Sequence, residues 1–286
     1  MGKRKAKGLT LALLTCLISS KSARAADDYT SLVLEGHRYL DSGDAEAAVT
    51  SFQRAYQRMQ TENQSSDRLF LVLIDLSSAY LETGNYSQAE RVLLTAADLP
   101  NKTPNVVRDA EIINNQVCIQ VRLGRYSEAK AASERALRMI ENVPAATALV
   151  PNILDDLATA EIYLGEGHQA LRHQQEAVQR WQTLLPPDHS DLINGYSVLA
   201  TAQYLNGQFK EAGVSIQNAV SAAERHYGLQ SPRLARLLRD QLIVLRRLGL
   251  KSEIKARERE LSNIPATPNT QQTTYARAAS AVQPQP

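Results

Sequence analysis

Cysteine and large aromatic residues are scarce in this sequence. Two cysteines, three phenylalanines and one tryptophan occur among its 286 residues. Two cysteines cannot build the disulfide framework on which many small secreted domains depend, so apolar packing must hold the fold together. Alanine and leucine recur in place of aromatic residues, and both favour closely packed helices.

Motifs that carry catalysis or hold a cofactor are also missing. The five histidines are scattered, and neither an H-E-x-x-H pattern nor a glycine-rich phosphate loop occurs. The stretch Gly195-Tyr196-Ser197-Val198-Leu199 lacks the second glycine of a nucleophile elbow. We therefore expect no enzyme activity, no catalytic residues, no cofactor and no metal.

Long hydrophobic runs are absent except near the N-terminus. There, four basic residues within residues 3–7 precede an apolar run over residues 9–18, and Ala23-Arg24-Ala25 follows it. The run is shorter than the roughly 20 residues of a membrane-spanning helix, and the small-x-small tripeptide fits a cleavage site. We predict a secretory signal peptide over residues 1–25, cleaved after Ala25. A retained membrane anchor and a lipoprotein attached through Cys16 are the alternatives.

An excess of basic charge disappears once that segment is removed. The full chain has 32 basic and 30 acidic residues, and six of the basic residues lie within residues 1–25. The remainder carries a small net negative charge, which does not indicate nucleic-acid binding. We expect a periplasmic or secreted protein with no integral membrane segment after cleavage and no nucleic-acid partner.

A repeat of about 41 residues runs through the rest of the chain. Glycine recurs at intervals of 40–42 residues, and each of these glycines closes a helical pattern. They are Gly43, Gly84, Gly124, Gly165, Gly207 and Gly249. A glycine suits the left-handed residue that ends a helix. Prolines fall about midway between these glycines, so prolines indicate the joints between repeats and glycines the turn within each repeat.

Apolar spacing between these glycines is helical. Leu73, Leu76 and Tyr80 follow the i, i+3, i+7 pattern of one helix face. Alanine keeps a single register across five repeats, at positions 48, 89, 129, 170 and 212, and only Ile254 replaces it in the sixth. Small side chains in register predict pairs of helices that approach each other closely.

These residues resemble the tetratricopeptide repeat. The first unit matches its pattern of apolar, small and aromatic positions through Leu32, Gly36, Tyr39, Gly43, Ala48, Phe52 and Ala55. The period exceeds the usual 34 residues, which about one extra turn in each helix explains. The longer repeat and the joints at residues 185–191 and 227–233 are similar to the kinesin-light-chain type of this repeat. An unrelated antiparallel helical bundle is the alternative.

The resemblance implies an all-α fold, a right-handed α-α superhelix of about six antiparallel helix pairs. It covers residues 26–262, in units at roughly 29–62, 67–102, 106–144, 148–186, 189–228 and 231–262. Residues 263–286 are rich in Pro, Thr and Gln, and we predict a disordered tail there.

The resemblance also implies a curved groove lined by the first helix of each unit, where an extended peptide or another protein binds. Groove positions recur about one helical turn apart, so their side chains line up. In this chain they are Asn114 in the third unit; Asn152, Asp155 and Thr159 in the fourth; and Asn194, Ser197, Thr201 and Tyr204 in the fifth. Amides and hydroxyls of this kind can hydrogen-bond a peptide backbone. Ordinary solvated surface is the alternative.

The sixth unit is rich in basic residues. They are Arg233, Arg236, Arg239, Arg246, Arg247, Lys251, Lys255, Arg257 and Arg259. A solvated face that caps the stack is one interpretation, and a site for an anionic partner is the other. The first five units have no Lys or Arg at the matching groove positions, which argues against a chaperone C-terminal tail as the ligand.

Two functions agree with these observations. The favoured one is a protein-binding scaffold or adaptor in an exported compartment, with a partner whose identity the sequence does not reveal. The alternative is an accessory module of cell-envelope biogenesis that holds an enzyme or a glycan.

Overall fold

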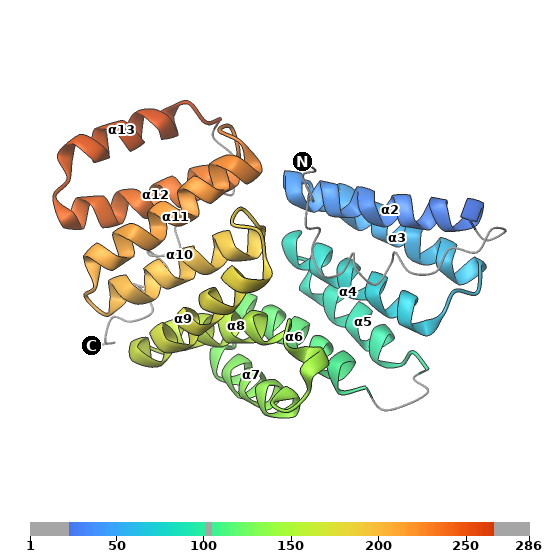
Figure 1. The fold of residues 1–286 in the computed structure, drawn as a ribbon. Helices are drawn as coiled ribbons and strands as arrows, with labels where there is room; N and C mark the ends of the chain where they lie inside the picture. The colour runs from blue at the N-terminus through green and yellow to red at the C-terminus, as the bar shows by residue number, and fades with distance from the viewer. Residues whose placement is uncertain (1–22, 101–104, 266–286) are drawn as a thin grey trace, which may run out of the picture. The chain divides into compact units, whose positions relative to one another are not determined.

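The computed structural model describes residues 23–100 and 105–265 (Figure 1). Residues 1–22 of the predicted signal peptide, and residues 266–286 of the predicted tail, lie outside the described residues. Within the described residues the regular structure is helical and contains no strand. The all-α fold predicted from the sequence is therefore confirmed.

The helices follow one another with short connections. They are α2 (Ala23–Ser42), α3 (Ala45–Thr61), α4 (Ser66–Glu82), α5 (Tyr86–Ala97), α6 (Val106–Arg122), α7 (Tyr126–Ile140), the 3-10 helix η1 (Pro144–Ala146), α8 (Val150–Tyr163), α9 (Gly167–Leu184), α10 (Ser190–Leu205), α11 (Phe209–Tyr227), α12 (Pro232–Leu248) and α13 (Lys251–Ser262).

The chain divides into two compact units. Unit 1 comprises Met1–Arg125 and Ala132–Thr147, and unit 2 comprises Tyr126–Ala131 and Ala148–Pro286. In unit 1, α2 packs on α3 and α4 on α5, and α3 contacts α4 in turn. In unit 2, the pairs α8–α9, α10–α11 and α12–α13 pack in the same way, and α9 and α11 join each pair to the next. Each unit is thus a stack of helix pairs.

The turn inside each pair depends on glycine. Six glycines, at positions 43, 84, 124, 165, 207 and 249, have φ between 72° and 84°, a left-handed backbone that other residues rarely adopt. After α4, the N–H of Gly84 donates to Leu81 O at 3.1 Å and the N–H of Asn85 to Tyr80 O at 2.9 Å. These two bonds satisfy the last carbonyls of the helix in a Schellman arrangement. The sequence prediction for these glycines is confirmed.

Small residues allow the helices of a pair to approach. The alanines at 48, 89, 129, 170 and 212 are all fully buried. At Gly36 of α2, an added Cβ would lie 2.6 Å from Phe52 Cε1 on α3, so the phenyl ring occupies the space that a larger residue would fill. Helix α13, the second helix of the last pair, has no buried residue. Alanine register and glycine contacts therefore explain why these helices pair.

Candidate functional site

The predicted groove residues of unit 2 lie on α8 and α10, the first helices of two successive pairs, which contact each other (Figure 1). Asn194 is exposed. Asn152, Asp155, Thr159 and Tyr204 are half-buried. These five side chains, called the inner strip below, retain surface that a partner can reach. Their contact with a partner stays a prediction.

Three of the predicted partner-binding residues have little exposed surface in the structure. Asn114, Ser197 and Thr201 are only 9 %, 4 % and 0 % exposed. The hydroxyl of Thr201 donates to Ser197 O at 3.0 Å, within its own helix. Short side chains on a packed helix end below the level of their neighbours, and a threonine hydroxyl can be satisfied by the preceding turn. These three residues are therefore part of the packed interior.

Asn152 accepts a hydrogen bond from Trp181, the only tryptophan in the sequence. The indole Nε1–H of Trp181 on α9 donates to Asn152 Oδ1 at 3.2 Å. The indole ring then lies against α10, where an added Cβ at Gly195 would be 2.6 Å from Trp181 Cζ3. Asn152 therefore joins three helices as well as belonging to the inner strip. The sequence showed the amide but not its partner.

Asp155 is tied to the neighbouring pair through Gln174. This glutamine of α9 is fully buried, and its Nε2 donates to Asp155 Oδ1 at 2.6 Å and to Gly195 O at 3.0 Å. A buried amide with two acceptors links α8, α9 and α10, because losing either bond would leave a polar atom unpaired in the interior. Gln174 was not predicted from the sequence. The available signal was a polar residue about one turn after Ala170, which lies in the alanine register of the repeats.

The environment of Asp155 changes its ionisation. The pKa of this carboxyl is raised to about 8: burial is the largest cause, the negative charges of Asp156 and Asp191 add to the rise, and the hydrogen bond from Gln174 opposes it. Low polarity and like charges both disfavour a carboxylate. Asp155 is therefore largely protonated at neutral pH, and can donate as well as accept a hydrogen bond.

In unit 1, titratable side chains lie on α2, α4 and α6: His37, Asp75 and Glu111. His37 Nε2 on α2 lies 3.3 Å from Asp75 Oδ2 on α4. Burial lowers the pKa of His37, but its hydrogen bond with Asp75 and nearby negative charges outweigh burial and raise the pKa above the usual value. On α6, burial raises the pKa of Glu111 to about 7, with Arg108 opposing and Asp75 adding to the rise. The sequence pattern placed Glu111 on the groove face of the third unit but did not predict that His37 and Asp75 lie close together, because they belong to separate helices.

Four of the nine basic residues of the sixth unit have the following partners within unit 2. The guanidinium of Arg233 lies over the Tyr227 ring at 5.2 Å, and that of Arg247 over the Phe209 ring at 4.5 Å. Arg246 pairs with Glu258 at 2.9 Å, and Arg257 pairs with Glu224 at 3.7 Å. These contacts fasten α12 and α13 to each other and to α11. Part of the basic composition of this unit therefore has a structural role.

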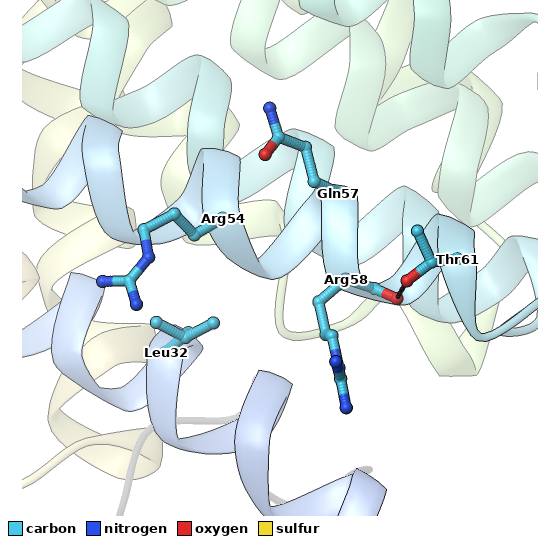
Figure 2. Close-up of a pocket in the computed structure, with 5 residues that line it drawn as sticks. All are labelled: Leu32, Arg54, Gln57, Arg58 and Thr61. Carbon is cyan, nitrogen blue, oxygen red and sulfur yellow. Dashed lines mark hydrogen bonds between the residues drawn. The ribbon is translucent and has the colours of Figure 1, made fainter.

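A shallow hollow of about 320 Å³ lies between α2 and α3 in unit 1 (Figure 2). Leu32 of α2 faces it, together with Arg54, Gln57, Arg58 and Thr61 of α3. Figure 2 shows Gln57 projecting from α3 away from Leu32, and the Thr61 hydroxyl bonded to Arg58 O at 2.8 Å. The lining combines no nucleophile with a base, so the hollow offers no arrangement for catalysis.

The described residues include neither a cluster of metal-ligating side chains nor a helix that could span a membrane. Within the part of the chain that the structure describes, no group of three His, Cys, Asp or Glu side chains is placed to hold a metal ion. None of the helices in residues 23–100 and 105–265 combines the length and the apolar character that crossing a bilayer requires.

Comparison with known proteins identifies the repeats. Residues 152–191 and residues 110–143 each match a family model described as the tetratricopeptide repeat. No relative was found among curated protein sequences.

Solved structures with similar folds agree with these matches. BtubC (BKLC) from P. vanneervenii is 18% identical with a TM-score of 0.59, and the match covers 82% of this chain and 95% of BtubC. PilW, a type IV pilus biogenesis factor, is 17% identical with a TM-score of 0.53, and the match covers 85% of this chain and 96% of PilW. A Rap protein complexed with competence and sporulation factor is 10% identical with a TM-score of 0.59, covering 88% and 70% of the two chains.

The tetratricopeptide repeat is thus matched over residues 110–143 and 152–191, and the fold is similar to that of these solved structures. The repeat predicted from the sequence is confirmed in these two segments. Proteins built from these repeats are typically scaffolds for protein–protein interaction rather than catalysts.

Proposed function

We propose that this protein is an exported, non-catalytic scaffold that binds an extended segment of a partner protein along the inner strip. The observation that carries the proposal is the inner strip itself: Asn194 is exposed and four further polar residues are partly exposed on α8 and α10, in one repeat register. On α8 these groups lie about one turn apart, and amide, hydroxyl and carboxyl groups in such a row can pair with the backbone of an extended chain.

The inner strip predicts a direct contact at Asn194. A photo-crosslinking amino acid at position 194 is expected to capture a partner in cells, because this side chain is the exposed member of the strip. The same crosslinker at Val214 on α11, which is 63 % exposed, is the matched control. Crosslinked products are separated by electrophoresis and identified by mass spectrometry.

A blocking substitution completes that experiment. Asn194→Arg is expected to reduce co-purification of the captured partner by about tenfold, since a bulky charge obstructs the strip. Val214→Arg is expected to leave co-purification unchanged. If both variants retained the partner equally, and position 194 captured no more than position 214, the inner strip would be ordinary solvated surface.

Export is the second part of the proposal, and it is supported by the basic, apolar and small-x-small pattern of residues 1–25. The expected N-terminus of the protein recovered from cells is Ala26. Edman degradation or mass spectrometry of the N-terminal peptide measures it. Recovery of the chain with residues 1–25 intact in the cytosolic fraction would contradict both cleavage and export.

An accessory place in cell-envelope biogenesis is the second candidate function. The observation that favours it is the similar fold of PilW, a type IV pilus biogenesis factor, together with the predicted signal peptide. In this case the product crosslinked at position 194 would contain an envelope enzyme or a glycan. A partner with no connection to the envelope would exclude this candidate and leave the general scaffold.

A further inference from the structure

Glu111 of α6 is a half-buried carboxyl of unit 1 that has no ion pair among the described residues. Its oxygens accept no hydrogen bond there and are not enclosed, so a ligand can reach them. The guanidinium of Arg108, one turn earlier, is buried, lies over the Phe70 ring at 4.4 Å and donates to Ala96 O at 3.4 Å. Arg108 is therefore held against α4 and α5, and the carboxyl of Glu111 is left without a cation in contact.

A second carboxyl, that of Asp75 on α4, lies beside Glu111. The hydroxyl of Ser78 donates to Asn115 Oδ1 at 3.3 Å, which joins α4 to α6. Asp75 precedes Ser78 by one turn, and Glu111 precedes Asn115 by one turn. The two helices run in the same direction, because α5 reverses the chain between them and packs on both. One turn before the bond that joins them, the two carboxyls therefore face each other.

Hydrogen-bond acceptors outnumber donors around these two carboxyls. Asp75 Oδ2 has one partner, His37 Nε2 of α2 at 3.3 Å, which leaves most of its acceptor capacity unused. Asn114 is 9 % exposed, and its Oδ1 receives no hydrogen bond among the described residues. Helical side chains lean toward the N-terminus, so this amide leans over the turn that carries Glu111. A ligand with several N–H donors and no acceptor fits such surroundings.

We infer that Asp75 and Glu111 form a site on unit 1 for a lysine side chain of a partner protein. A lysine ammonium is a compact charge with three donors, so it can bond carboxyls from two helices at once. The planar fork of an arginine matches a single carboxylate better. The inference rests on the proposed function in that the ligand is a protein, and it adds a second contact, on the unit that does not carry the inner strip.

Binding of an ammonium at this site depends on pH. The pKa of Glu111 is raised to about 7, with burial as the largest cause, and a bound cation favours the ionised form. Glu111 must therefore release its proton on binding, and affinity rises as pH increases from about 6 to about 8. The other charged groups that act here are His37 and Asp41 from α2 and Arg108 from α6. Any proton that His37 loses over the same range removes a positive charge that competes for Asp75.

The test compares two pools of rhodamine-labelled heptapeptides, random among uncharged residues apart from a central Lys or a central Gln, by fluorescence anisotropy. At pH 8 the purified wild-type chain is expected to bind the Lys pool roughly tenfold more tightly than the Gln pool, the difference that a charge-assisted pair supplies. At pH 6 this preference is expected to disappear almost completely. Glu111→Gln is expected to remove the preference at both pH values. Glu90→Gln, the loss of an exposed carboxyl from α5 of the same unit, is the matched control and is expected to preserve it.

Three results would overturn the inference. Equal binding of the two pools at pH 8, or binding of neither, would reject the lysine site, while crosslinking at position 194 still tests the inner strip by itself. A preference that survived Glu111→Gln would place the cation elsewhere on the chain. A preference that was the same at pH 6 and pH 8 would exclude Glu111 as its cause. Asp75→Asn, which keeps an acceptor for His37 and loses the charge, is expected to weaken the preference severalfold, and it provides the comparison if circular dichroism shows that the Glu111 variant is unfolded.

Discussion

Trp181→Ala is expected to lower the free energy of unfolding of unit 2 by about 3–5 kcal/mol, the usual cost of deleting a large buried aromatic side chain. The indole is 4 % exposed, fills the space above Gly195, and donates to Asn152. Its removal leaves a cavity among α8, α9 and α10 and an unpaired amide oxygen on Asn152. Urea unfolding followed by circular dichroism at the helix band measures the loss, since the variant has no tryptophan fluorescence.

Trp181→Phe separates the two contributions to that loss. Phenylalanine keeps most of the ring and loses the N–H donor, so its expected cost is nearer 1–2 kcal/mol, the value of one partly buried hydrogen bond plus a smaller cavity. If the alanine variant were as stable as the phenylalanine variant, the ring could not be packed as the structure shows. Loss of partner binding without loss of stability in either variant would instead make Trp181 a contact residue.

Asp155→Asn is expected to make unit 2 more stable at high pH and to reduce the dependence of its stability on pH. The folded pKa of Asp155, about 8, lies above the 3.8 of an unperturbed aspartate. Between these values the folded chain keeps a proton that the unfolded chain has lost, so wild-type stability falls as pH rises from about 4 to about 8. Above that range both states are ionised and the cost is constant.

Asparagine can still accept the bond from Gln174, so the substitution removes the charge and keeps the link. The expected gain at pH 9 is roughly 2 kcal/mol or more, with little difference from wild type near pH 4. Urea unfolding at a series of pH values gives the result. Glu176→Gln, which removes a carboxylate from the exposed face of α9, is the control and should shift the whole curve by less than about 0.5 kcal/mol. A parallel shift of the Asp155→Asn curve at all pH values would contradict a buried, protonated carboxyl.

Local features of the sequence were enough to predict the helix pairs. A left-handed turn needs glycine wherever it occurs, so Gly84 and its equivalents were visible without knowing what surrounds them. Buried Ala89 and Ala212 were visible for a similar reason, because close helix approach limits the residue to a small side chain. Repetition of both signals at one period then made the family recognisable.

Contacts between helices could not be predicted in the same way. The repeat register predicted that Thr201 faces the groove, but in the structure Thr201 is fully buried. Burial depends on which neighbouring side chains cover a position, and the register does not contain that information. Asn152 and Asp155 were placed correctly on α8, yet their bonds to Trp181 and Gln174 come from residues 29 and 19 positions away. The local sequence pattern does not predict which distant side chain will form a hydrogen bond with Asn152 or Asp155.

The same difference separates the arginines of the sixth unit. Their number was evident from the sequence, and so was the alternative between a capping face and an anion site. Only the tertiary structure distinguishes Arg247, which lies over the Phe209 ring, from Arg239, whose Nη1 is enclosed without a hydrogen-bond acceptor among the described residues. The sequence alone determined the repeat, its period and its helical turns, because backbone conformation and helix periodicity are local properties. Tertiary packing decided which polar groups stay accessible and which carboxyl groups have a raised pKa, because burial and neighbouring charge depend on residues brought together from different helices.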